Sequence, residues 1–264
     1  MKNKTLLMAF VTFVLSAIFL GTFKAEVFAE EIPKVAIVSL DHVPFVQADN
    51  NSFYISAKNY TGDVQYQLFY IQESVMKDWK LISNADMTNG WTKPAKAQTP
   101  ITVDISNLNL KADYYRFAIR VKRVGVKGLK ENPYGDYDDA YPFTQKVEKD
   151  SSIRLNGEMN IQKTTFAKNE NLVINGVGNS SNDIQYKLHL FDEKKSEWMN
   201  GLTEYSSSTQ LNLTSIPEGT YIVDLWCKKN GSIKSYDGWK LKIINIINDV
   251  NNPSDDDLKI IDIN

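Results

Sequence analysis

The sequence predicts an all-β fold made of two tandem β-sandwiches, and three observations support this prediction. Segments such as residues 115–121 and 221–227 alternate apolar and polar side chains, which is typical of strands with one face on a core. Turn-forming runs, among them "NYTGD", "NSSND" and "IPEGT", separate these segments at sandwich-like spacing. A strand-like segment also occurs twice, as "DVQYQLFYIQ" from Asp63 and "DIQYKLHLFD" from Asp183. No sustained helical period follows the N-terminal segment.

The N-terminal segment, residues 1–29, has the features of a secretory signal peptide. Lys2 and Lys4 precede an apolar run from Leu6 to Leu20, and small residues lead to a predicted cleavage site after Ala29. The alternative is an uncleaved membrane anchor, because the apolar run approaches spanning length. We therefore expect a secreted protein, associated with the membrane only if the segment is retained.

Composition narrows the classes of partner. Without residues 1–29 the chain keeps 27 basic and 31 acidic residues, a net charge of −4. Basic clusters of the kind that bind nucleic acid are missing from the sequence. Cys227 is the only cysteine, so no intrachain disulfide can form and hydrophobic cores must stabilise the fold.

The two copies of the strand belong to a longer internal repeat. One copy spans residues 33–147, the other spans residues 153–247, and an acidic tail predicted to be disordered fills residues 248–264. The recurring aromatic residues are Tyr66, Trp79, Tyr115 and Tyr137 in the first copy, and Tyr186, Trp198, Tyr221 and Tyr236 in the second. In both copies an alternating strand ends in a turn, and a second strand then starts at a tyrosine. Period-two alternation and this spacing favour an immunoglobulin-like sandwich for each copy.

These tyrosines resemble the triple-tyrosine domain, also called the three-Y domain of two-component regulators. The resemblance covers both copies and implies a fibronectin-III- or immunoglobulin-like sandwich, used in clostridia in tandem arrays on secreted and cell-wall proteins, including amidases. It implies a structural motif of Tyr66, Tyr115 and Tyr137, repeated as Tyr186, Tyr221 and Tyr236. Inserted loops leave the third tyrosine of the first copy open among Tyr134, Tyr137 and Tyr141. No kinase, helix-turn-helix or amidase segment accompanies the repeats, so those roles do not carry over.

Several candidate residues have a structural explanation. Tyr115 and Tyr221 open strands directly after turns, where each ring can be buried and each hydroxyl can bond nearby backbone. Trp79 and Trp198 are interpreted in the same way, as rings buried in the cores rather than as platforms for sugar stacking. Cys227 shares a face with Tyr221 and is expected to pack as a small apolar residue.

Chemistry-bearing residues are sparse. His42 and His189 are too few for a zinc site and lack a flanking nucleophile motif. The run "YGDYDDAY" places Asp136, Asp138 and Asp139 in one predicted loop, where clustered carboxylates are weak calcium candidates. We expect no cofactor and no catalytic activity.

Trp226 is the most informative exception to the apolar-inside pattern. Alternation points it away from the core, and His189 and Phe191 share its face if the two strands are neighbours. This aromatic group is the candidate binding surface, unless the other copy or the linker covers it. The equivalent face of the first copy carries Arg116, Ala118 and Arg120.

The sequence therefore predicts a secreted, non-catalytic binding or adhesion protein. Cell-wall glycan, extracellular polysaccharide or a surface protein are the expected partners. One alternative is a cell-wall or polysaccharide hydrolase, or its remnant, that uses Asp138, Asp139 or Glu204. The other is a passive structural spacer.

Overall fold

The computed structural model describes residues 31–47, 50–149, 158–159, 163–174, 176–177, 183–199, 202–207 and 209–248. The predicted signal peptide, most of the expected junction at residues 147–157 and all but the first residue of the predicted acidic tail (residues 248–264) lie outside the described residues. The fold is all-β: the described part contains strands and one 3-10 turn but no α-helix. It contains no helix long and apolar enough to cross a membrane.

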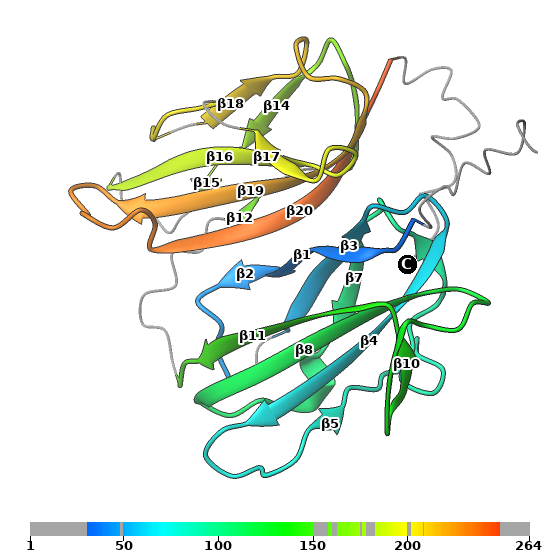
Figure 1. Cartoon of the computed structure of the whole chain (residues 1–264). Helices are drawn as coiled ribbons and strands as arrows, with labels where there is room; N and C mark the ends of the chain where they lie inside the picture. The colour runs from blue at the N-terminus through cyan, green and yellow to red at the C-terminus, as the bar shows by residue number, and fades with distance from the viewer. Residues whose placement is uncertain are drawn as a thin grey trace, which may run out of the picture. The chain divides into compact units, whose positions relative to one another are not determined.

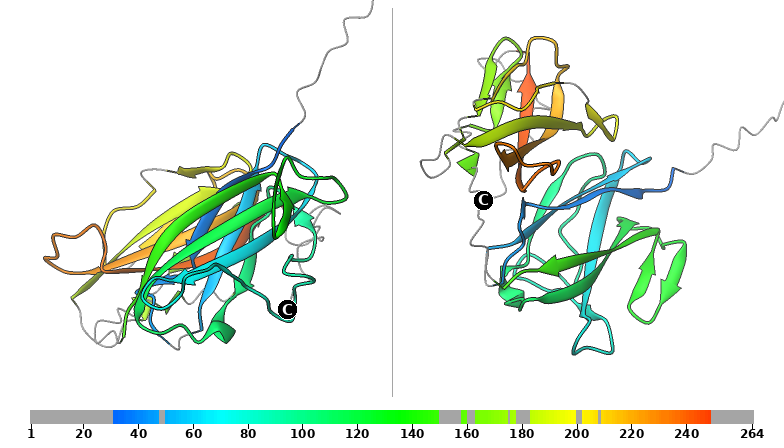
Figure 2. Two further views of the ribbon diagram at one scale, coloured as in Figure 1. Left: turned by 60° about the horizontal axis from the view of Figure 1, so that its bottom comes forward. Right: turned by 90° about the vertical axis from the view of Figure 1, so that its left-hand side faces the viewer.

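The N-terminal half, residues 32–149, forms two main sheets (Figure 1). Its elements are β1 (Lys34–Leu40), β2 (His42–Val43), β3 (Ser52–Lys58), β4 (Asp63–Gln72), β5 (Lys80–Leu81), β6 (Ala95–Lys96), β7 (Ile101–Asp104), the 3-10 turn η1 (Ser106–Leu108), β8 (Asp113–Arg123), β9 (Lys130–Asn132), β10 (Gly135–Tyr137) and β11 (Asp139–Val147). One sheet has the order β11-β8-β4-β5, with β6 also paired to β4, and the other has the order β1-β3-β7. Strands β4, β8 and β11 run side by side in all views (Figure 2).

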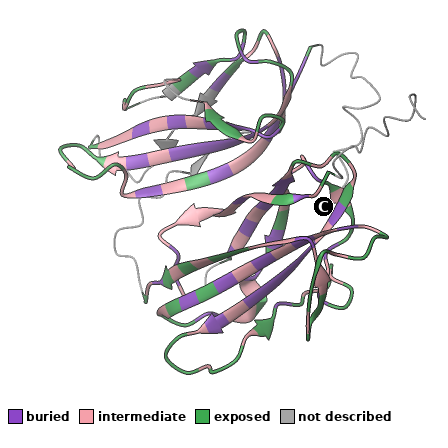
Figure 3. Cartoon of the chain, in the orientation of Figure 1, coloured by how far each residue is buried: buried purple, intermediate pink, exposed green. Residues whose placement is uncertain are grey.

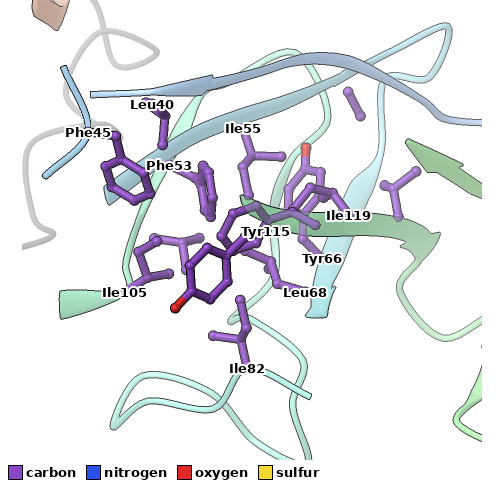
Figure 4. Packing of buried hydrophobic residues seen from close by; sticks show 14 of the residues in the cluster. Leu40, Phe45, Phe53, Ile55, Tyr66, Leu68, Ile82, Ile105, Tyr115 and Ile119 are labelled. Atoms are coloured by element: carbon purple, nitrogen blue, oxygen red, sulfur yellow. The ribbon is translucent and has the colours of Figure 1, made fainter. Parts of the chain in front are cut away.

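The alternation of β8 explains how this half buries its core. Tyr115, Phe117, Ile119 and Val121 are buried, and the residues between them are exposed or half-buried (Figure 3). Together with residues of β3, β4 and β7 they form one apolar cluster, so the two sheets pack face to face as layers (Figure 4). At about 25 cal/mol per Å² of buried apolar surface, this is the main stabilising term of the half.

The C-terminal half repeats the central strand arrangement. Its elements are β12 (Glu158–Met159), β13 (Thr165–Ala167), β14 (Asn171–Ile174), β15 (Gly176–Val177), β16 (Ile184–Asp192), β17 (Glu197–Met199), β18 (Thr209–Asn212), β19 (Gly219–Lys229) and β20 (Gly238–Ile247). The large sheet has the order β13-β20-β19-β16-β17, while β14 pairs β18 and β12 pairs β15. A second apolar cluster, separate from the first, is built on the inner face of this sheet.

Register matches between the halves at the predicted positions. Tyr66 of β4 lies opposite Val121 of β8, and Tyr186 of β16 lies opposite Cys227 of β19. Cys227 is buried in the second cluster, as its alternation predicts. The duplicated sequence segment thus occupies the same place in each large sheet.

Two tyrosine hydroxyls secure the turns that precede β8 and β19. The hydroxyl of Tyr115 accepts a hydrogen bond from the backbone N–H of Lys111 at 3.1 Å. The hydroxyl of Tyr221 donates one to the carbonyl of Pro217 at 2.9 Å. Both rings are buried and both bonds reach back four residues, so the prediction made for these two tyrosines is confirmed.

Tyrosine-to-phenylalanine variants should separate the contribution of the hydroxyl's hydrogen bond from that of the buried ring. We expect Tyr221→Phe to lower the free energy of unfolding by about 1 kcal/mol, because it removes one hydrogen bond and keeps the ring. Tyr66→Phe is the matched control, since the Tyr66 hydroxyl is buried without a partner in the described part. Urea denaturation of both variants measures the difference, and an equal loss in both would contradict the assigned role of the Tyr221 hydroxyl.

The two halves share a third, smaller apolar cluster. Ile37 of β1 packs with Phe191, Ile222 and Leu241, and Tyr54 lies against the same group. Strand β2 of the N-terminal half adds to the large C-terminal sheet by pairing with β20. Both halves belong to one compact unit that begins at Ile32. Residues on either side of the boundary expected between residues 147 and 153 therefore remain in contact with each other.

Candidate functional site

Four aromatic rings form a continuous row on the outer face of the C-terminal sheet. Ring centroids lie 4.4 Å apart for His189 and Trp226, 4.8 Å for Trp226 and Tyr236, and 4.9 Å for Tyr236 and Trp239. All four residues are half-buried, so each ring keeps part of its surface open to solvent. We call His189, Trp226, Tyr236 and Trp239 the aromatic row.

Strand register brings these rings together. Trp226 of β19 lies opposite Trp239 of β20 on one side and opposite Lys187 of β16 on the other. Alternation places all outward side chains of these strands on one face, because period-two geometry assigns every second residue to the same side. Tyr236 comes from the loop just before β20 and packs against both tryptophans.

A buried carboxyl lies beneath the row. Asp224 is 7% exposed and accepts a hydrogen bond from the indole Nε1 of Trp226 at 2.6 Å. Burial raises the pKa of Asp224 to about 7, an effect that the bond from Trp226 partly offsets. This bond fixes the Trp226 indole and so gives the row a defined surface.

Histidine 189 is held in the neutral form at neutral pH. Burial, and to a smaller extent the charge of Lys187, lower the pKa of His189. Its Nε2, the Oδ1 of Asp224 and the Nε1 of Trp239 are buried without a partner in the described part of the chain. The row therefore combines partly open aromatic faces with three buried polar atoms, two of which belong to its own rings.

The structure brings together two of the three predicted binding residues. His189 and Trp226 are in contact, as their alternation indicates. Phe191, in contrast, is 4% exposed and belongs to the cluster with Ile37. Its assignment to an open binding surface is corrected, because the N-terminal half covers this end of the sheet.

Sequence reasoning missed two members of the row. Tyr236 was assigned a structural role through the family resemblance, and Trp239 was not singled out. The signal for Trp239 was present, since it alternates in phase with Leu241 and Ile243 on the outer face. Tyr236 lies in a loop, where periodicity carries no information about direction.

The third tyrosine of the N-terminal half has a different environment. The guanidinium of Arg120 lies 4.6 Å from the ring centroid of Tyr137 and 4.4 Å from that of Phe69. Tyr134 and Tyr141 are 45% and 49% exposed. The face equivalent to the aromatic row is thus occupied here by a cation–π stack.

The two other tryptophans named in the repeat lie outside the cores. Trp198 is 41% exposed and contacts Phe191 edge-on, with centroids 5.2 Å apart. Trp79 is half-buried, and the guanidinium of Arg116 lies 5.8 Å from its ring. The expectation of core positions is wrong for both, since both follow a turn at the sheet margin.

The acidic run does not gather its carboxylates into one site. Asp138 is buried against Arg123, Asp136 accepts a bond from the N–H of Gly128, and Asp139 accepts one from the N–H of Val35 at 3.2 Å. Backbone bonding at Gly128 is the main cause that lowers the pKa of Asp136. Within the described residues no group of three or more metal-ligating side chains is found. The three calcium candidates therefore bind three different groups of the protein and do not share one site.

The residues named for a hydrolase are also dispersed. Asp138 and Asp139 belong to the N-terminal half, and Glu204 is exposed in the C-terminal half. Asp138 is fully engaged with Arg123.

A scan against protein-family models and a search of curated proteins each found no match for this chain. The triple-tyrosine resemblance therefore stays a prediction that rests on the spacing of the tyrosines.

Proposed function

We propose that this chain is a secreted, non-catalytic binding protein that uses the aromatic row to hold a glycan outside the cell. The observation that carries the proposal is the continuous set of four half-buried rings, His189, Trp226, Tyr236 and Trp239. Aromatic faces combine a large apolar surface with a polar edge, which suits them to sugar rings.

Electrostatics around the row favour a neutral or weakly charged ligand. Asp224 is half-protonated near pH 7 and His189 is neutral there. Neither residue therefore offers a full charge that could pair with a charged group of a ligand. Lys187 and Lys228 are engaged by the ring of Tyr205, at 6.0 Å and 4.2 Å from its centroid. A cell-wall or extracellular polysaccharide fits these conditions better than a strongly charged partner.

Cell-wall and glycan binding by Trp226 variants tests the proposal. We expect Trp226→Ala to weaken retention on purified walls or polysaccharide about tenfold, equivalent to about 1.4 kcal/mol. Trp226→Phe should keep most of the binding, because an aromatic face remains. Trp198→Ala is the matched control, since Trp198 is an exposed tryptophan of the same half outside the row.

The outcomes separate the hypotheses. Loss of retention in Trp226→Ala, with a cooperative unfolding transition that shows the fold is kept and normal binding by Trp198→Ala, supports the proposal. Equal retention by all three variants contradicts a role of the row and favours the spacer hypothesis. Capture of a surface protein by the row, with no polysaccharide bound, would reassign the ligand class.

A further inference from the structure

A cavity that differs chemically from the aromatic row is lined by residues of β1, β3 and the turn between β16 and β17. Its volume is about 520 Å³, within the usual range for ligand pockets. Its lining residues are Lys34, Lys58, Asn59, Gln98, Lys194, Lys195 and Ser196. We call it the lysine pocket.

Strand register places two of the lysines face to face. Lys34 of β1 and Lys58 of β3 are direct partners in the antiparallel ladder. Like charges directly opposite each other destabilise a strand pair. The ladder is held in this register by buried neighbours such as Ile55 and Ala57, so the repulsion between the two ammonium groups is retained in the fold.

The other two lysines come from the tight turn between β16 and β17. Asp192 fixes this turn by accepting the N–H of Lys195 at 3.1 Å, and Ser196 has a left-handed backbone with φ of 55°. Lys194 and Lys195 are exposed at the tip of the turn. The turn thus presents its ammonium groups from a defined backbone rather than from a free loop.

Little negative charge offsets these four lysines. Lys195 pairs with Asp192 at 3.7 Å, while Lys34, Lys58 and Lys194 form no ion pair within the described residues. The adjacent Glu193 is buried, and burial raises its pKa to about 7, so its carboxyl carries only part of a charge at neutral pH. The chain as a whole is acidic, with a formal charge of −2, so this positive site is a local feature.

We infer that the lysine pocket is a binding site for a phosphate-bearing anion. Lysine ammonium groups bind phosphate as point charges, and several of them suit a ligand with more than one negative charge. Asn59 and Gln98 add amide donors that make no hydrogen bond elsewhere in the described part. The volume exceeds the need of a single phosphate, which points to a diphosphate or to a run of a phosphate polymer. This site is independent of the aromatic row.

Pyrophosphate and long-chain polyphosphate are the probes, titrated into the purified protein by calorimetry at about 0.05 M ionic strength, where screening is weak. We expect the double variant Lys34→Gln/Lys58→Gln to weaken binding of either probe about tenfold, because it removes two of the four charges. The double variant Lys77→Gln/Lys80→Gln is the matched control, since it removes two exposed lysines away from the pocket.

The Lys34→Gln/Lys58→Gln variant also relieves the repulsion across the strand pair, so it should fold at least as well as the parent. Binding of both probes, weakened about tenfold only in this variant, supports a pocket for the phosphate group itself. Binding of polyphosphate alone, with the same selectivity, supports a polymer as the ligand. Absence of binding, or an equal loss in the control variant, overturns the inference.

Discussion

Replacement of Asp138 by alanine is expected to lower the free energy of unfolding by about 3–5 kcal/mol, because it removes the carboxylate that faces a buried guanidinium. Asp138 and Arg123 form the most buried ion pair described in this chain, with side chains 0% and 3% exposed. Arginine stays protonated in proteins, so Arg123 cannot escape the cost by losing its charge.

The geometry explains why the loss should be large. One oxygen of Asp138 accepts the backbone N–H of Arg123 at 2.9 Å and its Nε at 3.1 Å, and the other accepts Nη2 at 3.0 Å. The N–H of Leu129 adds a fourth contact at 3.3 Å. The carboxylate thereby joins the end of β8 to the loop that leads into β9.

Urea denaturation at neutral pH measures this effect. Asp86→Ala is the control, because Asp86 and Lys93 form an ion pair whose side chains are 80% and 74% exposed, and such pairs contribute little. Asp138→Asn removes the charge but keeps the shape of the side chain. We expect its free energy of unfolding to lie between those of the parent and of Asp138→Ala. An Asp138→Ala variant as stable as Asp86→Ala would show that the pair adds nothing.

Alternation made the long strands predictable. From Tyr115 onward every second residue of β8 is buried, and the duplicated segment forms β4 and β16, because burial on one face of a sheet imposes period two on the sequence. In β19 the inward positions are buried as well, but so are Ile222 and Asp224 on the other face. The roles of the tyrosines near the starts of β8 and β19 were predictable because each hydroxyl bonds a backbone group only four residues earlier in the sequence.

What covers an outer face was not predictable. Alternation assigned Phe191 and Trp226 to the same side, but Ile37 and Tyr54, far away in sequence, bury one and leave the other half-open. The same applies to Asp138, which looks like part of a solvated acidic turn until Arg123 is placed against it. Short strands such as β2 depend on such distant contacts as well.

Acidification from about pH 8 to about pH 5 is expected to raise the free energy of unfolding by about 2 kcal/mol through Glu193 alone. Glu193 is 1% exposed, and neither carboxylate oxygen meets hydrogen-bond geometry with a described group, including nearby Ser56. Burial raises its pKa from 4.5 to about 7, and Asp192 adds to the effect. Burial raises the pKa of Tyr66, and the charge of Glu193 adds to that effect.

The direction follows from proton binding. Between pH 4.5 and about 7 the folded protein holds the Glu193 proton and the unfolded chain releases it. The stabilisation is therefore complete below pH 4.5 and is lost as the pH rises through about 7. Asp224 acts in the same direction, with a pKa raised from 3.8 to about 7. His189 opposes both, because its lowered pKa makes protonation of the folded state unfavourable.

Variants separate these contributions. Glu193→Gln should match the parent near pH 5 and be more stable by about 2 kcal/mol near pH 8, since the neutral amide never carries the buried charge. Glu197→Gln, an exposed position on the neighbouring β17, should leave the pH profile unchanged. Denaturation curves across this range decide the matter. If Glu193→Gln keeps the parental pH dependence, Glu193 does not contribute to it. Water or a cation must then reach the carboxylate in solution, and Glu193 is not buried there against the N-terminal half.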